Sequence, residues 1–104
     1  MLNTIPVTVN CPAKKALKYA YEALLSFEKA QSNYIKENTY TAYAEFKTKW
    51  ATACLVNIWP LSDSECRMFI MVFDLSAYSH TPKEILQVYP EFIKRFSELL
   101  EQDS

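Results

Sequence analysis

The chain has 104 residues and no glycine, and this absence constrains its fold and chemistry more than any other feature. Glycine makes up about 7% of an average protein. The Walker and Rossmann phosphate-binding loops depend on it, because a side chain would block the approach of the phosphate. Both nucleotide-binding motifs are therefore excluded. The glycine turns of tight hairpins are also missing, which favours helices joined by proline, serine and asparagine loops.

The length leaves room for one hydrophobic core, so we expect a single domain over residues 1–104. Apolar residues make up 50% of the chain and charged residues 22%, which is typical of globular proteins. No stretch reaches about 18 apolar residues, and the first residues lack the pattern of a signal peptide. These features predict a cytoplasmic protein without a membrane partner.

Two long helices are predicted in the first part of the chain. From Pro12 to Asn38, apolar side chains recur at spacings of three and four residues. A second helix is expected from Thr39 to Trp59, because Asn38 or Thr39 can cap its start and Pro60 would end it. Its back face is polar at first and turns apolar in the last turns.

Two further helices are predicted by their start signals. Ser62 and Glu65 have the spacing of a capping box and precede a run that is apolar nearly all round. Thr81 opens the last pattern with a capping box and a proline in the first helical position. Within that pattern, Pro90 cannot donate to the carbonyl of Leu86, so the helix should kink or restart near Tyr89.

These elements predict an all-α fold, a compact bundle of about four helices. The segment 4–10 alternates apolar and polar residues but contains Pro6, so we expect a short extended N-terminal arm. Short apolar runs rich in Val, Ile and Phe also fit β-strands. The alternative is therefore an α+β fold with a small sheet built from residues 4–10, 53–59 and 67–73.

The sequence offers few residues for catalysis or for holding a cofactor. Cys11, Cys54 and Cys66 lack metal-ligand spacing, and His80 is the only histidine. We therefore expect no metal, no cofactor and no enzymatic activity. An enzyme that uses Cys66 and His80 stays open as an alternative, which requires the two side chains within hydrogen-bond reach.

The charge distribution gives a second alternative. The net charge is −1, but residues 1–50 hold seven lysines against four glutamates, whereas residues 51–104 carry an acidic excess. Lys14, Lys15 and Lys18 form a basic cluster that is followed directly by Tyr19 and then by Tyr21. A nucleic-acid-associated regulator would need these lysines together on one face. Without a net basic charge, we do not expect a nucleic-acid partner.

Aromatic residues are abundant, with seven Tyr, six Phe and two Trp, and Tyr and Trp dominate the energetics of protein interfaces. On helical wheels, Tyr19 points away from the first apolar stripe, and the apolar patch of Leu55, Val56 and Trp59 interrupts a polar face. We expect these four residues to form a protein interface, either with a second copy in a homodimer or with a foreign protein. The predicted function is a small non-enzymatic protein-binding module, acting as an inhibitor, adaptor or regulator.

Overall fold

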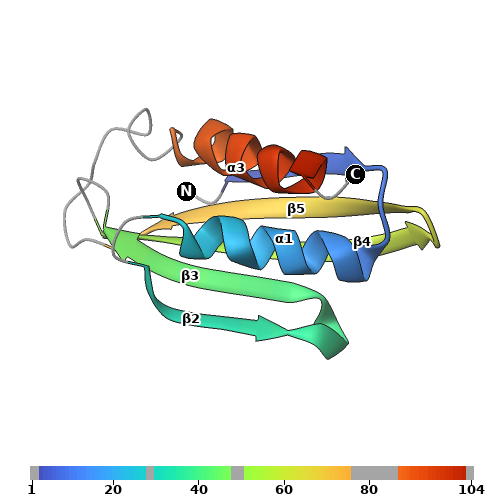
Figure 1. The fold of residues 1–104 in the computed structure, drawn as a ribbon. Helices are drawn as coiled ribbons and strands as arrows, with labels where there is room; N and C mark the ends of the chain where they lie inside the picture. Colours follow the sequence, from blue (N-terminus) through green and yellow to red (C-terminus); the bar gives the residue numbers. More distant parts are fainter. Residues whose placement is uncertain (1–2, 28–29, 48–50, 76–86, 103–104) are drawn as a thin grey trace.

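The computed structural model describes residues 3–27, 30–47, 51–75 and 87–102. They form a five-stranded antiparallel sheet in the order β1-β5-β4-β3-β2, with two helices lying across one of its faces (Figure 1). The prediction of an all-α helical bundle is therefore wrong. The bounds of the elements are β1 Asn3–Val9, α1 Ala13–Leu25, β2 Gln31–Lys36, the 3₁₀ turn η1 Glu37–Thr39, β3 Thr41–Lys47, β4 Ala51–Ser62, β5 Glu65–Asp74 and α3 Val88–Gln102.

The helices predicted over residues 39–59 and from Ser62 onward are strands of this sheet. Strands β4 and β5 carry apolar side chains on both faces, so the period-2 alternation that marks a half-buried strand is hidden. The alternative of a small sheet is closer to the structure. Its three segments, 4–10, 53–59 and 67–73, correspond to β1, β4 and β5.

The turns between strands form without glycine. Ser62, predicted as a helix cap, ends β4, and its Oγ accepts a hydrogen bond from the Ser64 N–H at 3.3 Å in the hairpin to β5. Between β2 and β3, the turn η1 is followed by Tyr40 in the left-handed region, with φ at 48°. A residue with a β-carbon is uncommon there. The prediction that missing glycine disfavours hairpins therefore fails, because serine and tyrosine take these positions.

The core lies between the sheet and the two helices. Alternate residues of each strand point toward the helices, and this inner face includes Val56 and Ile70, which are both fully buried. On α1, Ala16, Ala20 and Ala23 are also fully buried. Their small side chains let the helix approach β3 and β4 closely. The helix predicted over residues 12–38 is thus confirmed only for α1. Its second half is wrong, because Gln31–Lys36 pairs with β3 as strand β2.

Helix α3 begins at Val88, so Pro90 lies in its first turn, where a missing N–H breaks no hydrogen bond within the helix. The helix does not kink there, and the predicted restart near Tyr89 corresponds to its first residues. The Tyr89 hydroxyl accepts a hydrogen bond from the backbone N–H of Val72 at 3.3 Å, which ties the start of α3 to β5. The predicted cap Thr81 lies outside the described residues.

Candidate functional site

The side of the sheet opposite α1 and α3 is apolar, and we call it the outer face. Pairing places Tyr43, Leu55 and Met71 side by side on neighbouring strands, all pointing away from the helices. No described helix or strand covers them (Figure 1). The large apolar and aromatic residues of the outer face are Tyr34, Tyr43, Leu55, Trp59, Phe69, Met71 and Phe73.

An antiparallel sheet with one solvated face normally carries polar side chains there. Here the charged side chains lie toward the rim, among them Lys36 on the edge strand β2, Glu45 near one end of β3, and Arg67 with Glu65 at the opposite end of the sheet. Polar side chains of Asn57 and Thr41 lie between Leu55 and Trp59. The outer face is therefore mainly apolar, with polar groups at few positions within it and with charges toward its ends.

Trp59 is the most exposed large side chain of the outer face, at 61%. Its indole N–H donates to Asn57 Oδ1 at 2.5 Å, and its ring meets Phe69 edge to face with centroids 6.3 Å apart. Asn57 in turn donates to Thr41 Oγ1 at 3.1 Å. These contacts restrict the orientation of the exposed indole.

A second aromatic pair lies on the β2 side of the outer face. The rings of Tyr34 and Tyr43 stack with centroids 5.0 Å apart, and the Tyr43 hydroxyl donates to Glu45 Oε2 at 3.0 Å. Burial, together with the Glu45 carboxylate, raises the pKa of Tyr43 to about 12. The phenol therefore stays neutral near physiological pH and presents an uncharged aromatic surface.

The four predicted interface residues divide between the two faces. Trp59 and Leu55 lie on the outer face, whereas Val56 is fully buried against the helices and Tyr19 is 8% exposed in the core. Because side chains alternate along a strand, Val56 has to point away from its two neighbours. The remaining aromatic and apolar members of the face, such as Phe69 and Met71, were missed. In the strand alternative, period-2 alternation puts Phe69 and Met71 on one face of their strand, but only the pairing register places them beside Leu55.

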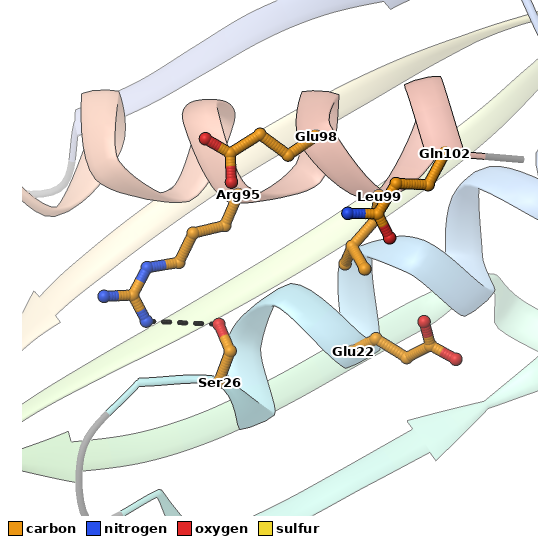
Figure 2. A pocket seen from close by; sticks show the side chains of 6 residues that line it. All are labelled: Glu22, Ser26, Arg95, Glu98, Leu99 and Gln102. Atoms are coloured by element: carbon orange, nitrogen blue, oxygen red, sulfur yellow. Dashed lines mark hydrogen bonds between the residues drawn. The ribbon is translucent and has the colours of Figure 1, made fainter.

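Two surface pockets flank helix α1. The first, of about 360 Å³, lies between α1 and α3 and is lined by Glu22, Ser26, Arg95, Glu98, Leu99 and Gln102 (Figure 2). Arg95 is already engaged there: it donates to Glu91 Oε1 at 2.9 Å and to Ser26 Oγ at 3.1 Å, and it stacks 4.2 Å from the centre of the Phe27 ring. Arg95 therefore joins the two helices and offers little charge to a ligand.

The second pocket, of about 350 Å³, shows where part of the basic cluster lies. Lys14 and Lys18 line it together with Glu22, Glu37 and apolar residues of α1 and β2. The two carboxylates weaken the positive potential that a phosphate backbone would need. The mixed charges around Lys14 and Lys18 therefore give the nucleic-acid alternative no support, and that alternative stays untested.

Of the two residues of the enzyme alternative, Cys66 lies in the described part of the chain. Cys66 is buried on the inner face of β5, where its thiol is hydrogen-bonded to that of Cys11. Burial raises the pKa of Cys66 to about 11, so little thiolate forms near neutral pH. His80 lies outside the described residues. Among the described His, Cys, Asp and Glu side chains, no group of three or more is arranged to hold a metal ion.

No family model matches the sequence, and no curated protein is similar to it. Solved structures share its fold. BexL, a di-domain ARO/CYC protein from the BE-7585A biosynthetic pathway, superposes with a TM-score of 0.67 at 7% identity over 97% of this chain. The match spans 46% of the BexL chain, just under half its length.

Two further structures are matched along nearly their whole length. A START superfamily protein from Mycobacterium smegmatis gives a TM-score of 0.59 at 8% identity, over 98% of this chain and 95% of its own. Ara h 8.0201 gives 0.54 at 13% identity, over 97% and 99%. The chain therefore has a START/Bet v1-like fold. Within the described residues, no helix is long and apolar enough to span a membrane.

Proposed function

We propose that this chain is a non-enzymatic protein-binding module, an inhibitor, adaptor or regulator, and that the outer face of its sheet is the binding surface. One observation carries the proposal: an apolar and aromatic sheet face that none of the described elements covers. Burying such a surface against a partner removes apolar area from water, at roughly 25 cal/mol per Å² before the costs of association.

Within this surface, Trp59 is the proposed anchor. Interface hot spots are enriched in Trp and Tyr, and truncation of a hot-spot residue costs 2 kcal/mol or more. The indole is exposed, hydrogen-bonded to Asn57 and packed edge to face against Phe69. These features support its role as the residue on which affinity depends most.

A binding site for a small molecule inside the fold has less support. The inner face is filled by packed side chains, including the fully buried Ala42 and Ala44 on β3 opposite the alanines of α1. An aromatase or cyclase activity, suggested by the ARO/CYC name of BexL, also lacks support, because 7% identity carries no catalytic residue over to this chain.

The test is affinity capture from the native host with three baits: the unaltered chain, Trp59→Ala and Leu25→Ala. Leu25 is 40% exposed on α1 and lies away from the outer face, so it is the matched control. We expect proteins retained by the first and third baits to be lost on Trp59→Ala, whose affinity should fall roughly thirtyfold or more. The same proteins on all three baits would contradict the proposal.

The folded state of each bait is checked by thermal unfolding before capture. Because Trp59 is exposed, its replacement should leave the unfolding midpoint nearly unchanged. Ile70→Ala provides the contrast, since removing this fully buried side chain should cost about 2–5 kcal/mol of stability.

A further inference from the structure

We infer that the partner of the outer face is a second copy of this chain, packed face to face so that the two sheets form a sandwich. The inference rests on the proposed function and names the occupant of the same surface. Sheets pack onto one another about 10 Å apart when both inner faces are apolar. The outer face supplies such a surface on each copy, as an isologous two-fold interface requires.

The edge strands of the sheet are poorly suited to self-association. Self-association through the sheet would therefore use its outer face. On the edge strand β1, Pro6 has no N–H to donate to an added strand. On the opposite edge, β2 has an irregular register between Gln31 and Tyr34, and Ser32 within it has φ at 47°. Irregularity and proline are common devices that prevent edge-to-edge pairing.

The area of the outer face fits a dimer of standard size. The five strands have 6 to 12 residues. With strands about 4.8 Å apart and about 3.3 Å per residue, the sheet covers on the order of 700 Å² before side-chain relief is added. A stable interface buries roughly 800 Å² on each partner. The area of the outer face is therefore close to the area that each partner of a stable dimer buries.

The test measures the mass of the purified full chain by light scattering and sedimentation, at protein concentrations from about 1 to 200 µM, a range chosen around the micromolar affinity of a modest interface. The monomer has a mass of 12.1 kDa, and we expect a species of twice that mass. Trp59→Ala should raise the dissociation constant roughly thirtyfold. Lys94→Glu, a matched charge reversal on the exposed surface of α3, should leave it unchanged.

A dimer that Trp59→Ala leaves intact would overturn the outer face as its interface.

A chain that stays monomeric throughout would overturn the second copy as the occupant. The capture experiment then decides the proposed function separately. Proteins lost only on Trp59→Ala would show that the face binds a foreign partner, whereas an unchanged set of proteins would mean that the proposed function has failed too.

Discussion

At the scale of single residues, neighbouring positions of one strand have opposite roles. Leu55 and Trp59 reach the outer face, whereas Val56 between them is fully buried. The same alternation places Cys54 and Cys66 inside, where burial raises the pKa of Cys54 to about 12 and that of Cys66 to about 11, from an ordinary value of 9.0. The buried thiols therefore affect stability at alkaline pH.

We predict that the free energy of unfolding falls as the pH rises above about 9. In the unfolded chain, the thiols ionise near 9, but in the folded chain they hold their protons to higher pH. The unfolded state then binds fewer protons than the folded state, so stability falls with increasing pH, while below pH 9 this contribution is fully present. Chemical denaturation at pH 8 and pH 10 measures the difference. Cys54→Ala is the control and should show a smaller fall, because it removes one of the thiols; an equal fall would contradict this account.

At the scale of elements, the turns show how a chain without glycine builds a sheet. Serine, threonine and asparagine side chains support the backbone, as when Asn57 donates to the Thr39 carbonyl oxygen at 3.2 Å beside the turn η1. Ser32 in β2 and Tyr40 after η1 adopt positive φ values of 47° and 48°. A side chain in this region costs about 1–2 kcal/mol relative to ordinary backbone. Part of the local stability is therefore lost at these two positions.

Replacing Ser32 by glycine should recover part of that cost. The side chain is exposed in β2, so little packing is removed, and glycine accepts a positive φ without strain. The gain is reduced by the greater freedom of glycine in the unfolded chain, which leaves about 0.5–1 kcal/mol of added stability. Thermal or denaturant unfolding measures the change. Ser97→Gly, at an exposed position inside α3, should destabilise by a similar amount, and stabilisation by both substitutions would refute the argument.

At the scale of the whole molecule, stability is concentrated in the middle of the sheet. Strands β4 and β5 pair with neighbours on both sides, whereas β1 and β2 are edges and every residue of β2 is exposed. Helix α1 packs mainly on β3 and β4, and α3 packs beside α1 (Figure 1). The centre of the sheet is therefore the part of the described chain with the most neighbours.

Amide hydrogen exchange should follow this arrangement. We expect the slowest exchange at buried positions of β4 and β5, near the rate set by global unfolding, and the fastest exchange among the strands in β2, which opens without disturbing the core. Mass spectrometry of peptides after timed exchange measures it. If the chain dimerises through the outer face, higher protein concentration should slow exchange in β4 and β5 further, and equal protection of β2 and β4 would contradict the expected hierarchy.

The sequence by itself determined what is local. Helix α1, which is the first half of the helix predicted over residues 12–38, and the exclusion of glycine-dependent phosphate loops follow from residue type and short spacing. Leu55 and Trp59 were grouped on a helical wheel, but it is the alternation of strand β4 that places both on the outer face. The start of α3 could be read only in part, since Pro90 fits either an interrupted helix or a first turn.

Only the tertiary structure decided the fold class and the extent of the outer face. In β4 and β5 the apolar residues serve two surfaces at once, the core on the inner face and the uncovered outer face, and the resulting continuous apolar runs have no readable period. The pairing of Leu55 with Met71, and of Asn57 with Phe69, joins positions more than ten residues apart through backbone hydrogen bonds. The spacing of residues along the sequence does not predict which strands pair, because strand pairing depends on which distant segments meet.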